Sequence, residues 1–162
     1  MIKNMKKRLK DQRGLTLVEL LAVIVILGII AAIAVPSIGG IIQKSKEDAL
    51  KADAIAVLNA AKMHISSTNL TPDTSGGDTI TMDDSILTDY LDNSQYFKND
   101  GVDTSSAYKV EYSINAQTFK LTTTAGITAG KSTITFTSAE LKDINNDKEK
   151  GTRTIPKPAK TS

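Results

Sequence analysis

The chain has 162 residues, and it contains no Cys and no Trp. This length allows one modest domain together with a membrane segment, and the lack of Cys excludes disulfides and thiol nucleophiles. The formal net charge of +2 is unevenly placed, because residues 1–14 hold six of the 20 basic residues and one of the 18 acidic residues. The remainder has 14 basic against 17 acidic side chains, which argues against nucleic-acid binding through bulk charge.

The stretch from Leu20 to Ile42 has no charged residue and is longer than the roughly 20 apolar residues that cross a bilayer. The basic cluster before it predicts a single span with a cytoplasmic N-terminus. Three interpretations compete: a plain signal anchor, a secretory signal peptide cut after Ala34, and a processed membrane segment that later packs as a helix. Glu19 at the edge of the run favours the third, because a carboxylate in lipid is costly and suggests a function. A carboxylate that snorkels to the interface is the simpler alternative.

The next stretch, from Gln43 to about Ser67, keeps a helical period. We expect one helix from about Leu15 to about Ser67, because neither Gly nor Pro occurs between Gln43 and Leu70. Its first half is apolar all round and its second half is amphipathic. The apolar face of the second half consists of Leu50, Ala54, Val57, Leu58, Ala61 and Ile65. The other face carries Lys44, Asp48, Lys51 and Lys62.

The stretch "RGLTLVELLAVIVILGIIAAIAVPSI" resembles the N-terminal signature of type IV prepilins and pseudopilins. The resemblance covers about residues 1–60 and implies that a membrane peptidase cuts after Gly14. Leu15, where Phe is commonest in the family, would become the N-methylated N-terminus. Glu19 takes the place of the family's assembly glutamate, which we expect to pair with the Leu15 amine of a neighbouring subunit. Pro36 matches the family's helix-kinking proline, and a proline within a helix predicts a kink on physical grounds as well.

The rest of the chain predicts an α+β fold, in which the long helix packs on a small antiparallel sheet. Residues 71–78 read as a loop, and residues 83–93 as a short helix capped by Asp. Strict alternation predicts strands over residues 108–114, 118–122 and 133–137, joined as a meander, with residues 125–130 as a turn. The expected organisation is a leader over residues 1–14, a membrane and filament-core segment over 15–43, a globular domain over 44–155 and a flexible tail over 156–162.

Sites for chemistry are scarce in this sequence. The best metal candidate is the alternation of Asp143, Asn145, Asp147 and Glu149, which resembles the start of a calcium loop. Lys148 stands where such a loop needs Gly and the distal Glu is missing, so a solvated loop without cofactor is the preferred interpretation, although some pseudopilins carry calcium in this region. The single His, His64, is expected on a solvated helix flank, and no catalytic arrangement accompanies it.

The favoured hypothesis is therefore a structural subunit of a type IV pilus, and not an enzyme. The resemblance implies a membrane-anchored precursor that is cleaved, methylated and polymerised into a surface filament for adhesion or motility. Its partners would be other copies of the chain, a prepilin peptidase, an assembly platform and an ATPase, without direct binding of nucleic acid. The lack of Cys suggests the Gram-positive type. One alternative is a pseudopilin of a competence DNA-uptake or type II secretion system, and another is a secreted or anchored binding domain with an ordinary signal.

Overall fold

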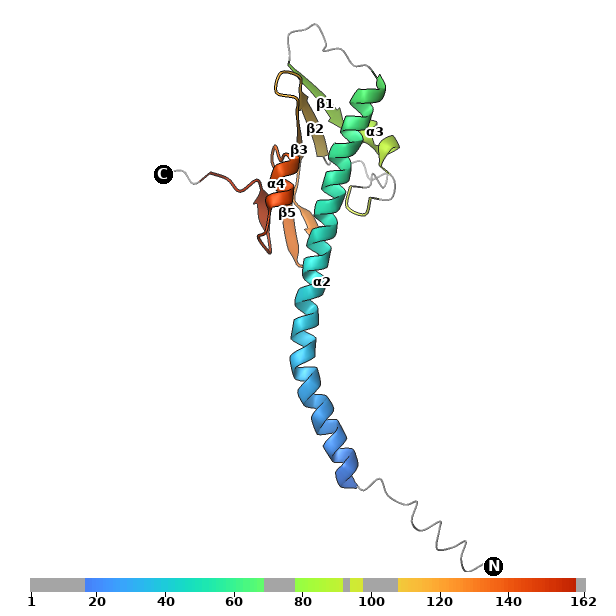
Figure 1. The fold of residues 1–162 in the computed structure, drawn as a ribbon, viewed down its shortest axis with the longest axis vertical. Helices are drawn as coiled ribbons and strands as arrows, with labels where there is room; N and C mark the ends of the chain where they lie inside the picture. Colours follow the sequence, from blue (N-terminus) through green and yellow to red (C-terminus); the bar gives the residue numbers. More distant parts are fainter. Residues whose placement is uncertain (1–16, 69–77, 92–93, 98–107, 160–162) are drawn as a thin grey trace, which may run out of the picture. The chain divides into compact units, whose positions relative to one another are not determined.

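The computed structural model describes residues 17–68, 78–91, 94–97 and 108–159. The chain divides into two units, one formed by residues 1–42 and the other by residues 43–162. The helix α2, Leu17–Thr68, runs without interruption through the end of the first unit and the start of the second (Figure 1). The prediction of a single helix from about Leu15 to about Ser67 is confirmed over the described residues.

The amphipathic half of α2 contributes one wall of the core in the second unit. Leu50, Ala54, Val57, Leu58 and Ala61 are fully buried, as their helical spacing predicted. Ile65 is partly buried and packs against the same core. Burial of this stripe is what holds the second half of α2 to the sheets, since apolar burial is the main favourable term in folding.

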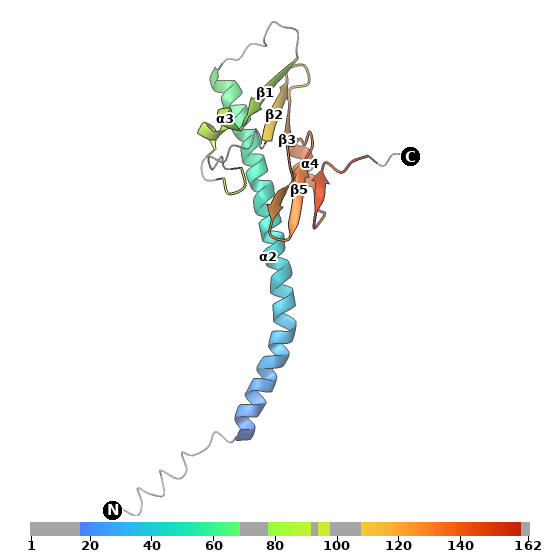
Figure 2. The same ribbon diagram turned by 180° about the vertical axis from the view of Figure 1, so that it is seen from behind.

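The described residues of the second unit also form two three-stranded sheets (Figure 2). The first sheet is antiparallel, in the order β1 (Thr79–Asp83), β2 (Tyr108–Ser113) and β3 (Thr118–Thr123). In the second sheet, β4 (Ile127–Ala129) pairs antiparallel with β5 (Ser132–Phe136), and β5 pairs parallel with β6 (Arg153–Ile155). Mutual backbone hydrogen bonds of 2.8 Å between Leu121 and Ala139 link β3 to the segment after β5.

In the described part of the chain, three short helical segments lie between these strands. Helix α3, Asp84–Leu87, begins after Asp83, whose carboxylate accepts a hydrogen bond from the Ile86 N–H, so the predicted Asp cap is confirmed. A 3₁₀ turn, η1, continues it over Thr88–Tyr90. Helix α4, Leu141–Asn146, is capped reciprocally by Glu140 and Asp143.

The structure corrects the expectation of a single meander sheet. Strands β1 and β6 lie outside the segments predicted as strands, and β4 occupies part of the stretch expected to be only a turn. Thr154 and Ile155, which directly precede the expected flexible tail, belong to β6, and Ile155 is buried. The α+β class itself is confirmed, because the long helix packs against small sheets that are mainly antiparallel.

Candidate functional site

The predicted processing site falls within residues 1–16, shortly before α2 in the sequence. Gly14 and Leu15 are outside the described residues, so cleavage after Gly14 and methylation of Leu15 stay predictions. Glu19 is described, and it lies in the first turn of α2. A negative charge is favoured there, because the first backbone N–H groups of a helix carry a partial positive charge.

The apolar half of α2 exposes a continuous hydrophobic surface. Its large side chains have exposed fractions from 51% at Ile42 to 82% at Leu17. An 18-residue window within α2 has a mean hydropathy of 3.0 and no buried residue, so the helix meets the length and composition needed to cross a membrane. So large an apolar surface requires a cover, which lipid or other helices can supply.

Pro36 lies inside this half of α2, and the helix continues on both sides of it. The kink expected at Pro36 stays a prediction. Gly28, Gly39 and Gly40 lie in the same half, and a Cβ added to any of them would meet no atom within 4 Å. Contacts within the described chain therefore do not require glycine at these three positions.

A buried ion cluster, formed by Gln43, Glu47, Asp147 and Arg153, ties α2 to the second sheet. Glu47 is 3% exposed, and its carboxylate accepts hydrogen bonds from the Arg153 guanidinium at 2.7 Å and from the Ser132 hydroxyl at 2.7 Å. The Gln43 side-chain amide donates to it at 3.0 Å, and the Gly151 N–H at 3.3 Å. Burial opposes ionisation of Glu47, but these donors outweigh it and lower its pKa to about 2.

Arg153, at the start of β6, links both carboxylates of the cluster. Its guanidinium donates to Asp147 through Nε, at 3.0 and 3.1 Å to the two oxygens, and through Nη2 at 2.6 Å. Such a fork arrangement is among the stronger charge-assisted hydrogen bonds. Lys51 adds a hydrogen bond of 3.1 Å to the Asp147 carbonyl. The cluster therefore fastens the C-terminal segment to the helix without a disulfide.

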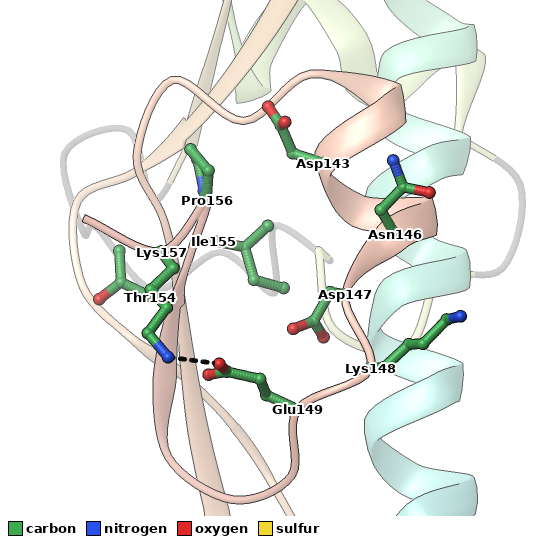
Figure 3. A pocket seen from close by; sticks show the side chains of 9 residues that line it. All are labelled: Asp143, Asn146, Asp147, Lys148, Glu149, Thr154, Ile155, Pro156 and Lys157. Carbon is green, nitrogen blue, oxygen red and sulfur yellow. Dashed lines mark hydrogen bonds and ion pairs between the residues drawn. The ribbon is translucent and has the colours of Figure 1, made fainter. Parts of the chain in front are cut away.

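The predicted calcium loop lies beside a pocket of about 210 Å³ that is lined by α4, the following loop and β6 (Figure 3). The Asp143 carboxylate accepts a hydrogen bond from the Glu140 N–H, and the Asp147 carboxylate accepts one from Arg153. Glu149 accepts a hydrogen bond of 2.6 Å from Lys157, which Figure 3 marks with a dashed line. Asn145 does not line the pocket.

Among the described residues, no group of three His, Cys, Asp or Glu side chains converges as a metal site. The donor set of this loop therefore does not fit a calcium ion well, because protein donors already engage its three carboxylates. A solvated loop without cofactor stays the prediction, and calcium binding stays the alternative that these contacts do not favour.

The ion cluster was not predicted from the sequence. A signal was present, since Glu47 continues the buried face of α2 one turn before Leu50. Nothing in the sequence identified Arg153 as its partner, 106 residues later. Asp53 was missed in the same way, although it accepts hydrogen bonds from the Gln95 and Tyr96 N–H groups at 2.8 and 3.0 Å. His64 lies on α2, as expected, but it is only partly exposed and makes an edge-on contact with Tyr90.

Comparisons with known proteins agree with the N-terminal signature. A family model described as the prokaryotic N-terminal methylation motif matches residues 9–35. The chain is similar to the type II secretion system core protein G of Vibrio cholerae, with 35% identity over 71 residues, which cover 44% of this chain and 49% of that protein. The core protein G of Aeromonas hydrophila is 40% identical over 73 residues, covering 45% and 50%, respectively. That of Escherichia coli is 40% identical over 53 residues, covering 33% and 37%.

The chain thus spans half or less of the length of these curated relatives. No solved structure matches it. The similarity supports the N-terminal part of the chain as a segment of the prepilin and pseudopilin type, and it leaves the role of the second unit to be argued from its own residues.

Proposed function

Because the chain carries the N-terminal segment of the type IV prepilin and pseudopilin family, we propose that it is a structural subunit of a pilin-like filament. The observation that carries this proposal is the exposed apolar half of α2, which follows a basic leader and has Glu19 in its first turn. Such a helix suits lipid in the precursor and neighbouring helices in a polymer. The methylation motif over residues 9–35 supports the same conclusion.

In this proposal the precursor spans the membrane once, with residues 1–14 in the cytoplasm. A prepilin peptidase cuts after Gly14 and the new amine of Leu15 is methylated, which leaves it basic. As the subunit leaves the membrane, the Leu15 amine of one copy pairs with Glu19 of another. An unpaired charge in an apolar bundle is costly, so the pair sets the axial register between subunits. An assembly platform and a cytoplasmic ATPase drive the process, and the chain itself has no enzymatic role.

Two kinds of filament fit this proposal. The length of the second unit suits a surface pilus used for adhesion or motility. The named relatives favour the other member of the class, a pseudopilus of a type II secretion system. Deletion of the gene separates the two: a pilus subunit is needed for surface filaments, whereas a pseudopilin is needed for export of proteins to the medium. A competence filament would instead be revealed by loss of DNA uptake.

The intact mass of the mature protein tests the proposed processing. We expect a chain that begins at Leu15 and carries one added methyl group, isolated from the membrane or from sheared filaments. A chain that begins at Val35 would support a secretory signal peptide cut after Ala34. A chain that still begins at Met1 would support a plain signal anchor, and both of these results contradict the proposal.

A further inference from the structure

Five exposed lysines of the second unit form what we call the headgroup surface. Two of them, Lys44 and Lys46, follow the apolar half of α2 directly, and the others lie on loops that flank β5 and β6. The full set is Lys44, Lys46, Lys131, Lys148 and Lys150. Lys44, Lys148 and Lys150 line one groove of about 360 Å³ beside α2, together with Lys51 and the carboxylates of Glu47, Asp48, Asp147 and Glu149.

The loops that carry these lysines are fastened to the start of the amphipathic half of α2. The Gln43 side chain accepts a hydrogen bond of 2.8 Å from the Lys131 N–H and donates one of 2.8 Å to the Ala129 carbonyl. Glu47 accepts a hydrogen bond from the N–H of Gly151, the residue after Lys150. The ion cluster therefore holds Lys131 and Lys150 at the level of Lys44 and Lys46.

The acidic side chains near the headgroup surface are matched by other cations. Asp48 pairs with Lys51 at 3.2 Å, Glu149 with Lys157 at 2.6 Å, and both Glu47 and Asp147 with Arg153. Within the part of the chain that the structure describes, none of the five lysines forms an ion pair with a carboxylate. Figure 3 shows the Lys148 side chain directed away from the carboxylates of Asp147 and Glu149. The five positive charges are thus available to an external anion.

The length of the apolar segment puts Lys44 and Lys46 at the depth of the lipid headgroups. From Leu17 to Ile42, α2 is about 39 Å long at 1.5 Å per residue. A bilayer is about 30 Å thick in its hydrocarbon core and about 40–45 Å with its headgroups. A precursor that spans the membrane with its leader in the cytoplasm therefore brings Lys44 and Lys46 to the opposite headgroup layer.

We propose that the headgroup surface binds anionic phospholipid headgroups while the protein spans the membrane, before it is extracted into a filament. This inference rests on the proposed function, because it requires the apolar half of α2 to span the bilayer. Basic residues beyond the outer end of a span oppose the usual excess of Lys and Arg on the cytoplasmic side, so they need a use of their own. Each lysine close to an anionic surface strengthens the attachment by about fivefold. Bound headgroups would hold the second unit against the membrane until the subunit is extracted.

The test uses the full chain, reconstituted in vesicles of phosphatidylcholine alone or of an equal mixture with phosphatidylglycerol. A membrane-impermeant reagent acetylates exposed lysines, and mass spectrometry gives the rate at each one. We expect acetylation of Lys131, Lys148 and Lys150 to be about threefold slower or more in the anionic vesicles, with recovery in high salt. Lys62 and Lys142, which are exposed elsewhere on the second unit, serve as internal references and should not change.

A matched pair of variants identifies the lysines that matter. In one variant, Lys131, Lys148 and Lys150 are all replaced by Gln. This variant should lose most of the slowing of acetylation that anionic vesicles cause at Lys44 and Lys46. Replacing Lys62 and Lys142 by Gln should leave that slowing unchanged. All five positions are exposed, and equal melting temperatures of the two variants in detergent would show that both are folded.

Three outcomes would overturn the proposal. Equal rates in both vesicles would show that anionic lipid is not bound. If acetylation in phosphatidylcholine vesicles slows as the amount of protein per vesicle increases, a second copy of the chain would be the partner. Equal slowing by inorganic phosphate in detergent would reveal a site for small anions. None of these results changes the mass of the mature chain, so failure here remains distinguishable from failure of the proposed function.

Discussion

Two carboxylates of α2 lie where a charge is costly, and they differ in how far the sequence reveals their roles. Glu19 borders a long apolar run, so its position alone indicated a function. Glu47 lies on the buried face of the amphipathic half and depends on Arg153, which is remote in sequence. Periodicity shows which face of a helix is buried, but it cannot show which distant side chain will meet a charge on that face.

Replacing Glu19 by Ala tests the assembly role that we propose for this residue. We expect insertion and cleavage to continue, because the leader and Gly14 are unchanged and loss of a charge eases residence in lipid. Filament growth should fall strongly, since an uncompensated Leu15 amine would cost several kcal/mol at each contact between subunits. Immunoblots of the membrane fraction report processing, and electron microscopy reports filaments. Normal filaments from a fully processed Glu19→Ala protein would contradict the assembly role. Glu19 would then be a carboxylate that only snorkels to the interface.

The pKa of Glu47 makes stability depend on acid. The pKa of Glu47 is about 2 in the folded chain and has its ordinary value of 4.5 in the unfolded chain. The unfolded chain therefore takes up the proton first as the pH falls. The stabilisation is complete above about pH 4.5 and is lost as the pH falls toward 2, and it amounts to about 3 kcal/mol. Urea unfolding of the full chain in detergent at several pH values measures this contribution.

The variant Glu47→Gln provides the control for this acid dependence. It should be less stable at neutral pH, because Arg153 loses a buried partner, by about 3 kcal/mol. It should also lose stability less steeply than the natural chain between pH 4.5 and 2. A slope as steep as that of the natural chain would mean that other carboxylates cause the loss in acid.

At the scale of the elements, the sequence was informative where alternation was long. Strands β2, β3 and β5 have five or six residues each, with alternating apolar side chains, and all three were predicted. Strands β4 and β6 have three residues each, too few to show a period of two. The parallel pairing of β5 with β6 depends on a connection through α4, which carries no local turn signal of the kind that marks a hairpin. In β1, Ile80 and Met82 alternate with polar residues in the same way, although this strand was not among those predicted.

Two glycines with positive φ allow a sharp test of the turn that meets Gln43. Gly130 has φ of 67°, and an added Cβ would clash with the Gln43 Oε1 atom. Gly151 has φ of 84°, but its added Cβ would meet nothing within 4 Å. Gly151→Ala should therefore cost only the conformational penalty, about 1–2 kcal/mol.

Gly130→Ala should cost about 1–2 kcal/mol more than Gly151→Ala, because the Gln43 side chain must move and give up its hydrogen bonds to the loop. The difference in the free energy of unfolding between the two variants, measured in urea, isolates the effect of the contact. If the two variants are equally stable, the Gln43 side chain adapts freely and the turn is not fastened through it.

At the scale of the whole molecule, the chain combines two units with different requirements. In the unit of residues 1–42, the described residues 17–42 expose their large apolar side chains, whereas the unit of residues 43–162 has a core of its own. Every large side chain in that core comes from the second unit, from Leu50 at its start to Ile155 near its end. The second unit should therefore fold without the apolar half of α2.

A pair of fragments tests both this independence and the position of the boundary. The sequence suggested that the globular domain begins at residue 44, but the Gln43 side chain bonds with Glu47, Ala129, Lys131 and Ser132 at 2.8–3.0 Å. We expect fragments 43–162 and 44–162 both to be soluble and folded. The longer one should be more stable by about 1–3 kcal/mol, because the shorter one loses these hydrogen bonds. Gln43→Ala in the longer fragment should reproduce the loss, which excludes a mere effect of helix length. Circular dichroism and urea unfolding decide the matter: two disordered fragments would show that the core of the second unit needs the rest of α2, and equal stabilities would move the boundary back to residue 44.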